Sequence, residues 1–170
     1  MNNDGINRRE MLALLAGMAP LLLTQGAKAS PIDTSETLYT QPGQIKFVPQ
    51  ADAPPKSLES AYLYSTPAAQ GLYYTLLRWY PGYMSGPHSY ASDRLCVVVS
   101  GSWWINSGAD FDLKHLVRVP PGTFVRRVAR TWHYDGVPHG EAEPVVIAIC
   151  GTGPVDIKLA EPDKPLVRAA

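Results

Sequence analysis

The sequence lacks an excess of charge of either sign. Its 15 lysines and arginines balance its 15 aspartates and glutamates, so the formal net charge at pH 7 is zero. A chain without a strong electric field has no general attraction for nucleic acid or for an anionic membrane surface. We therefore expect no nucleic-acid partner.

A long hydrophobic run is also absent. The most apolar stretch, from Met11 to Leu23, has too few residues to cross a bilayer as a permanent helix. It follows the pair Arg8-Arg9 and precedes the small residues of Ala27-Lys28-Ala29, which completes the three parts of an export signal. We interpret residues 1–29 as a leader of the twin-arginine type. The protein is then expected to be periplasmic or otherwise extracytoplasmic, without a stable membrane span after the leader is removed.

Helical periodicity is the third absence. After the leader, no segment keeps a 3.6-residue apolar period over the ten or more positions that a helix needs. Short runs of β-branched and aromatic residues, bounded by glycine and proline, take its place: GLYYTLLRWYPG, RLCVVVSGSWWIN, HLVRVPPGTFVRRV and EPVVIAICGTGP. They predict an all-β protein with an antiparallel sandwich or barrel.

Composition divides the rest of the chain into three parts. Residues 30–58 are rich in proline, serine, threonine and glutamine and predict an extended arm with one short strand at Ile45–Val48. Residues 59–160 contain the strand-like runs and form the predicted barrel. Residues 161–170 are expected to be a tail that lies on the surface or is loose.

The spacing of two glycines and three polar residues resembles the first motif of the cupin superfamily, and the resemblance spans roughly residues 60 to 155. In that motif two histidines and a glutamate lie between the glycines, whereas here only the first histidine keeps its identity, at the positions Gly82, His88, Tyr90, Arg94 and Gly101. The second motif keeps its turn, Pro120-Pro121-Gly122, but has Val125 where cupins have a histidine. The resemblance implies a single-domain cupin-type double-stranded β-helix, or jelly-roll barrel, with a degenerate metal motif.

A narrower resemblance adds a second histidine to the site. The segments GSWWINSGADFD, VPPGTFV and WHYDG resemble a branch of small bacterial cupins. In that branch the expected pocket positions are those of His88, Tyr90, Arg127 and His133. Side chains two residues apart share one face of a strand, so positions 88, 90 and 94 should all point into the barrel.

These residues favour a metal site. His88 and His133 are expected to bind through neutral imidazole, with Tyr90 as an oxygen ligand and Asp93 or water completing the shell. A phenol binds metal well only after it loses its proton, which a ferric ion promotes best. The candidates are therefore divalent or ferric transition metals, namely Fe, Mn, Zn or Ni. Asp93, however, has the wrong parity and should face away from His88.

Two arginines argue against a metal. An arginine about 6 Å from a divalent ion would repel it by about 5 kcal/mol at an effective dielectric constant near 20. Arg94 and Arg127 would instead suit a negatively charged ligand, with Trp104 as a wall of the pocket. A metal-free binding pocket and a purely structural pocket therefore remain as alternatives.

The two cysteines leave three interpretations open. Cys96 and Cys150 lie in predicted strands that are neighbours in a jelly roll, and an oxidising compartment would allow them to form a disulfide. Two buried free thiols are equally compatible with the sequence, and a role in the site is a third alternative.

The leading functional interpretation is an exported cupin that acts as a metal-dependent enzyme on a small organic substrate carrying an anionic group. The alternative is a cupin that binds a small ligand without metal and without catalysis. Because cupins often pair through their barrels, the resemblance also implies a homodimer. The sequence does not select a reaction.

Overall fold

The structure is a computed structural model that describes residues 32–33 and 35–170, so the predicted leader lies outside the described residues. The chain divides into two units, residues 1–39 and Thr40–Ala170. In the described part of the first unit, the Asp33 carboxylate accepts a hydrogen bond from the Ser35 hydroxyl at 2.6 Å. All described strands belong to the second unit.

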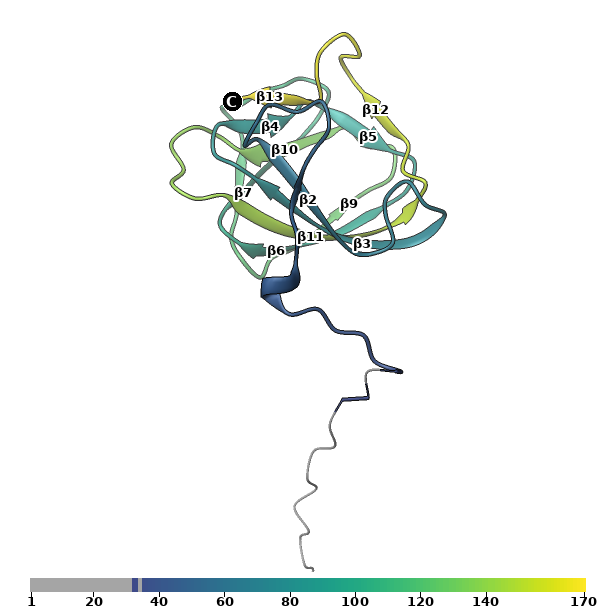
Figure 1. Cartoon of the computed structure of the whole chain (residues 1–170). Coiled ribbons are helices and arrows are strands. Elements are labelled where there is room, and N and C mark those ends of the chain that lie inside the picture. The colour runs from purple at the N-terminus through teal and green to yellow at the C-terminus, as the bar shows by residue number, and fades with distance from the viewer. Residues whose placement is uncertain (1–31, 34) are drawn as a thin grey trace, which may run out of the picture. The chain divides into compact units, whose positions relative to one another are not determined.

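The second unit is built almost entirely from short strands (Figure 1). A short 3-10 helix, η1 (Pro42–Gln44), precedes β1 (Val48–Pro49), β2 (Leu58–Tyr64), β3 (Gly71–Trp79), β4 (Tyr83–Ser85), β5 (His88–Tyr90), β6 (Arg94–Ser100), β7 (Trp103–Ser107), β8 (Val117–Val119), β9 (Phe124–Arg127), β10 (His133–Val137), β11 (Val145–Gly153), β12 (Ile157–Leu159) and β13 (Val167–Ala169). This confirms the predicted all-β class. Among the described residues there is no helix with the length and apolar character needed to span a membrane.

The strands form two antiparallel sheets. The first has the order β1-β2-β3-β11-β6-β9, and the second has the order β12-β5-β10-β4-β13, with β7 paired to β10 and β8 paired to β7. Strands far apart in sequence are neighbours, because β11 near the end of the chain lies between β3 and β6. The strands that carry the predicted site residues pair as β5 with β10 in one sheet and β6 with β9 in the other, and their inward side chains meet between the sheets.

The hydrophobic core follows from the alternation of side chains along the strands. In β3, Tyr73 and Thr75 are buried, whereas Leu72 and Tyr74, which alternate with them, are exposed. The buried residues of several strands form one cluster that includes Tyr73, Trp79, Trp103 and Ile147. Burying a large hydrophobic side chain of this kind contributes about 1.5–3 kcal/mol, so the core supports the two sheets on which the site is built.

The predicted strand at Ile45–Val48 is wrong in its position. The strand is Val48–Pro49, and it pairs with β2. The hydrophobic residues that suggested an earlier start, Ile45 and Phe47, instead pack against a small cluster formed by Ala61, Leu76 and Ala148. The arm is therefore fixed by packing on the sheet before its own strand begins.

The C-terminal segment is not a loose tail. Val167–Ala169 forms β13, which pairs antiparallel with β4, and the Val167 side chain is buried in the core. Glu161 forms ion pairs with Lys164 and Arg168 in the same segment. The short apolar stretch Leu166-Val167 gave little strand signal on its own, because its partner strand lies about 80 residues earlier in the chain.

Candidate functional site

The structure brings His88 and His133 together from two different strands. The two residues are directly opposite each other in the antiparallel pair of β5 and β10, and the centroids of their rings are 4.5 Å apart. Both side chains are buried. The two histidines singled out in the sequence therefore share one centre between the sheets.

Both imidazoles are oriented by the backbone. His88 Nδ1 lies 2.9 Å from the Gly86 carbonyl oxygen, and His133 Nδ1 lies 2.9 Å from the Thr131 carbonyl oxygen. Because a carbonyl only accepts, each Nδ1 carries the proton and donates it. In the neutral ring this leaves Nε2 with a lone pair that is available to a ligand.

Burial keeps both rings neutral at pH 7. Burial lowers the pKa of His88 below its usual value. Burial, followed by the proximity of His88, lowers the pKa of His133 to about 4. Neutral imidazole is the form that binds metal ions, so the site has its ligands in the right protonation state.

Asp135 is the third member of the cluster, and the sequence analysis did not assign it. One nitrogen of each imidazole and one oxygen of the Asp135 carboxylate all lie within 4.8 Å of one another. The signal was available in the WHYDG segment, since Asp135 is two residues after His133 and therefore on the same face of β10. Two histidines and one carboxylate form the donor set of facial-triad iron sites.

Two buried donors hold Asp135 in place. Trp103 Nε1 donates to Oδ1 at 3.1 Å, and the Arg127 guanidinium donates to Oδ2 at 3.1 Å. Burial alone would raise the pKa of Asp135, but the charge of Arg127, the nearby imidazoles and the Trp103 hydrogen bond together outweigh it, and the pKa lies below its usual value. Asp135 is therefore an ionised carboxylate at pH 7.

Tyr90 contacts both imidazoles. Its ring centroid lies 5.0 Å from that of His88 and 5.5 Å from that of His133. Burial raises the pKa of Tyr90 to about 12, so the phenol keeps its proton at pH 7. Asp135 is consequently a better oxygen ligand than Tyr90, which the sequence analysis had placed in that role.

The two inward arginines have different surroundings. Arg127 forms a buried ion pair with Asp135 and lies over the Trp103 ring, with its Cζ atom 5.1 Å from the ring centroid. The Cζ atom of Arg94 lies 4.3 Å from the centroid of the Tyr90 ring, and its Nε is buried without a hydrogen-bond partner. Arg94 has no carboxylate partner among the residues the structure describes.

Trp104 is not the inward-facing indole. Trp103 is buried against the core and Asp135, whereas Trp104 is half-buried and its Nε1 donates to Glu141 at 3.1 Å. The alternation of inward and outward side chains counted from His88 does not continue into β7. Gly101, with a φ of 72°, turns the chain between β6 and β7 and shifts the alternation. Asp93 does face away as expected, and its carboxylate binds Arg126 and the Ala129 amide.

Of the three interpretations of the cysteines, the disulfide is not formed, and Cys96 and Cys150 are free thiols. Their strands are neighbours, as expected, but Cys96 is opposite Ile149 and Cys150 is opposite Leu95. Residues one position apart in register point to opposite faces of the sheet, so the two sulfurs cannot meet. Cys96 is buried in the core, which raises the pKa of its thiol to about 11.

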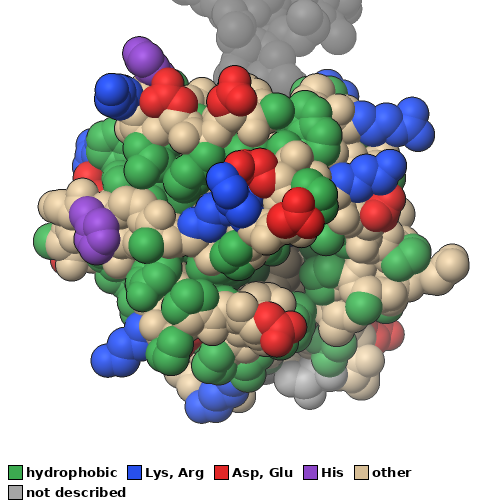
Figure 2. Space-filling view, turned by 90° about the horizontal axis from the view of Figure 1, so that it is seen from above, with side chains coloured by type: hydrophobic (Ala, Val, Ile, Leu, Met, Phe, Trp, Pro, Cys, Tyr) green, Lys and Arg blue, Asp and Glu red, His purple; other side chains and the backbone are tan. Residues whose placement is uncertain are grey.

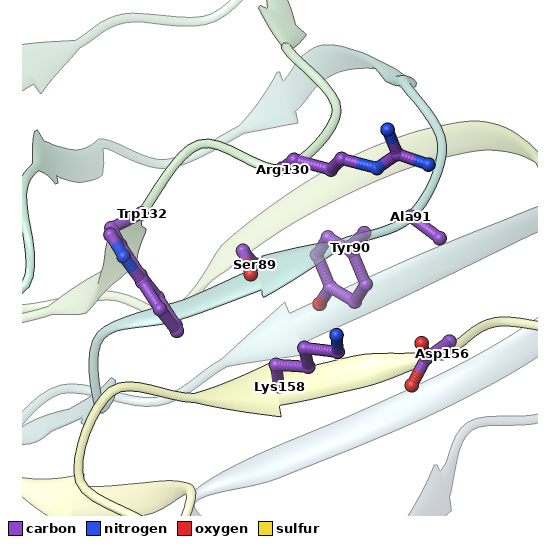
Figure 3. A pocket seen from close by; sticks show the side chains of 7 residues that line it. All are labelled: Ser89, Tyr90, Ala91, Arg130, Trp132, Asp156 and Lys158. Atoms are coloured by element: carbon purple, nitrogen blue, oxygen red, sulfur yellow. The ribbon is translucent and has the colours of Figure 1, made fainter.

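A cavity of about 470 Å³ opens beside Arg94 and Tyr90. Its walls are mainly hydrophobic, with Leu58, Leu77, Val155, Ile157 and Leu166 among them. A second hollow of about 340 Å³ lies beyond Tyr90, which lines both (Figure 3). Seen from above, the molecule is hollowed near the centre of the face in view, and hydrophobic side chains border the hollow (Figure 2).

The sequence matches no family model and no curated protein. Solved structures, in contrast, resemble the fold over most of the chain. An RmlC-like cupin protein from Ralstonia eutropha JMP134 is 18% identical, with a TM-score of 0.58, over 78% of this chain and 79% of that one. The polyketide cyclase RemF from Streptomyces resistomycificus is 17% identical, with a TM-score of 0.55, over 70% and 83% of the two chains.

A cupin-2 domain from Rhodospirillum rubrum gives the same result. It is 17% identical, with a TM-score of 0.53, over 72% of this chain and 79% of that chain. At such low identity the likeness concerns the fold, and it agrees with the two antiparallel sheets and with the motif positions recognised in the sequence. The chain therefore has the cupin fold, a double-stranded β-helix with a degenerate first motif.

Proposed function

We propose that the protein is a metal-dependent enzyme that acts on a small organic anion. The observation that carries the proposal is the buried cluster of two neutral imidazoles and one ionised carboxylate, whose donor atoms lie within 4.8 Å of one another. The structural neighbour RemF is itself an enzyme, a polyketide cyclase, which is consistent with catalysis on this fold.

The donor set fits a transition metal chemically. Both Nδ1 atoms are used by the backbone, and neither Nε2 makes a hydrogen bond to a described residue, so their lone pairs are available. Donors that share one ion are about 3 Å apart, so the three side chains would draw slightly together on binding. When bound, the metal would supply Lewis acidity or oxygen activation.

The other residues would position the substrate. Arg94 faces the cavity without an acidic partner and would bind the anionic group. Arg127 and Trp103 would hold Asp135 in a fixed orientation, and the hydrophobic walls would exclude water around the substrate. Tyr90, which contacts Arg94 and both imidazoles, would connect the anion-binding end of the cavity with the His88–His133–Asp135 cluster.

Elemental analysis of the purified full chain tests the proposal. We expect about one transition-metal ion per chain, lost in the H88A/H133A double variant and reduced at least tenfold in affinity in D135N. His115 provides a matched control because its side chain is 79% exposed and pairs only with Asp112, so H115A should keep the metal. Protein without stoichiometric metal would contradict the proposal and favour a metal-free binding pocket.

We also propose that the protein acts outside the cytoplasm. The proposal is supported by the Arg8-Arg9 pair, the apolar segment and the small residues before Ser30. Mass measurement of protein from the exported fraction should give a chain that begins near Ser30. An R8K/R9K variant that is still exported would contradict the twin-arginine route.

We further propose that the protein forms a homodimer. Exposed hydrophobic residues gather on the outer face of β6 and β9, namely Leu95, Val97, Val99 and Phe124. In the described sheet β9 is an edge strand, so a second copy could cover this face and continue the sheet. Sedimentation is expected to give twice the mass of the chain, and a monomer at micromolar concentration would contradict the dimer.

A further inference from the structure

Around the two imidazoles, the described residues supply one carboxylate, Asp135, for two arginines, Arg94 and Arg127. Arg94 of β6 lies directly opposite Arg127 of β9, and both side chains stack on aromatic rings. Asp135 neutralises Arg127, but no described carboxylate neutralises Arg94. A buried charge without a partner is costly, so this arrangement favours a ligand that brings the missing negative charge.

The lining of the cavity next to Arg94 indicates which chemical groups the ligand carries besides its negative charge. None of its lining residues is acidic, and its surface is mainly apolar, with the aliphatic side chains of Leu77, Val155 and Leu166 among the contributors. The Thr75 hydroxyl, a polar lining group, is already used, since it donates to the Ala61 carbonyl at 2.9 Å. The volume of about 470 Å³ lies in the range of small-molecule sites.

We infer that the ligand is an amphipathic monocarboxylate, with its carboxylate on Arg94 and its hydrocarbon part against the aliphatic wall. Among the described residues that line the cavity Arg94 is the one basic residue, so a second anionic group on the ligand would have no cationic partner in the wall. A planar carboxylate also matches the guanidinium, which can donate two parallel hydrogen bonds to it.

As a statement about the substrate, this inference rests on the proposed function. Tyr90 contacts Arg94 on one side of the site and the two imidazoles on the other, so the carboxylate end of the ligand lies nearest His88 and His133. The reaction would then take place on the carbon atoms close to the carboxylate, and the hydrocarbon end would serve only for binding.

Calorimetric titration of the full chain with four simple probes tests the ligand class. Hexanoate is expected to bind at least tenfold more tightly than 1-hexanol or hexylamine, because only hexanoate neutralises Arg94. From butanoate to hexanoate the affinity should rise about fourfold per methylene group. Hexylamine that binds as well as hexanoate, or an affinity independent of chain length, would overturn the inference.

Two arginine variants locate the binding. R94Q should weaken hexanoate binding at least tenfold and leave 1-hexanol binding unchanged, whereas R126Q should change neither, since Arg126 pairs with Asp93 on the outer face. Unchanged hexanoate binding in folded R94Q would overturn the inference. If R94Q does not fold, hexanoate binding by R94K and the comparison of hexanoate with 1-hexanol on the wild-type chain test the same inference.

Metal content measured in the same samples separates the two proposals. Selective hexanoate binding by protein that lacks metal would support the ligand class and contradict the metal-dependent enzyme. A stoichiometric metal without selective hexanoate binding would overturn the ligand class and leave the metal site intact.

Discussion

At the scale of single residues, the neutral imidazoles make stability depend on pH. In the unfolded chain a histidine titrates near pH 6.5, whereas in the folded protein burial lowers the pKa of His88 and brings that of His133 to about 4. Between these values the unfolded state binds more protons, so the free energy of unfolding falls as the pH drops from about 6.5 to about 4.

We expect His133 alone to account for a loss on the order of 3 kcal/mol over that range. Urea unfolding at pH 7, 6, 5 and 4 with a chelator present measures it, and H88Q/H133Q should reduce the slope. The lowered pKa of Asp135 acts only at more acidic pH and does not affect this window. Stability that is constant between pH 7 and pH 5 would show that the rings are not buried.

The ion pair between Arg127 and Asp135 gives a second prediction at this scale. Both side chains are about nine-tenths buried, so R127Q leaves an unpaired buried carboxylate and should cost about 3–5 kcal/mol. R126Q breaks a pair in which the arginine is 58% exposed and should cost less than about 1 kcal/mol. Equal effects in chemical denaturation would contradict the assignment of a buried pair.

At the scale of strands, register explains which sequence predictions failed. Alternation counted from His88 correctly placed Tyr90 in β5 and Arg94 at the start of β6 on the inward side, and Asp93 on the outward side. It failed for Trp104, because Gly101 interrupts the strand and resets the parity. It could not decide the cysteine pairing, since register between strands about 50 residues apart depends on the whole sheet.

The His88–His133–Asp135 cluster could be predicted only in part, because the pairing of distant strands depends on the whole sheet. His88 and His133 were found from motif positions, but their direct pairing between β5 and β10 is a tertiary feature. Asp135 was overlooked although it lies in the WHYDG segment that carried the resemblance and its spacing from His133 was informative, because the expected pocket set did not include it. The C-terminal strand was missed because its neighbour β4 and its buried environment are supplied by other parts of the chain.

The register of β6 and β11 predicts two free thiols. Alkylation of the unfolded protein without reductant should modify both Cys96 and Cys150, and adding a reductant should leave the melting temperature unchanged. In the native protein Cys96 should react far more slowly than Cys150, since it is buried and its thiol has a pKa of about 11. A mass two units lower, without alkylation, would reveal a disulfide.

At the scale of the whole molecule, the exposed face of β6 and β9 predicts self-association. A V97D/F124D variant places two charges on that face, where the wild-type side chains are 41% and 60% exposed. We expect it to sediment as a monomer with nearly unchanged stability, because neither side chain is part of the core. A variant that stays dimeric would locate the interface elsewhere.

The central claim is that two strands supply imidazoles, and a third buried side chain supplies a carboxylate, to one metal ion. Diffraction at the absorption edge of the metal found in the purified protein tests this claim most directly. We predict one anomalous peak within bonding distance of His88, His133 and Asp135, at about 2.0–2.2 Å from each donor atom. A peak elsewhere, or none between the two imidazoles, would contradict it.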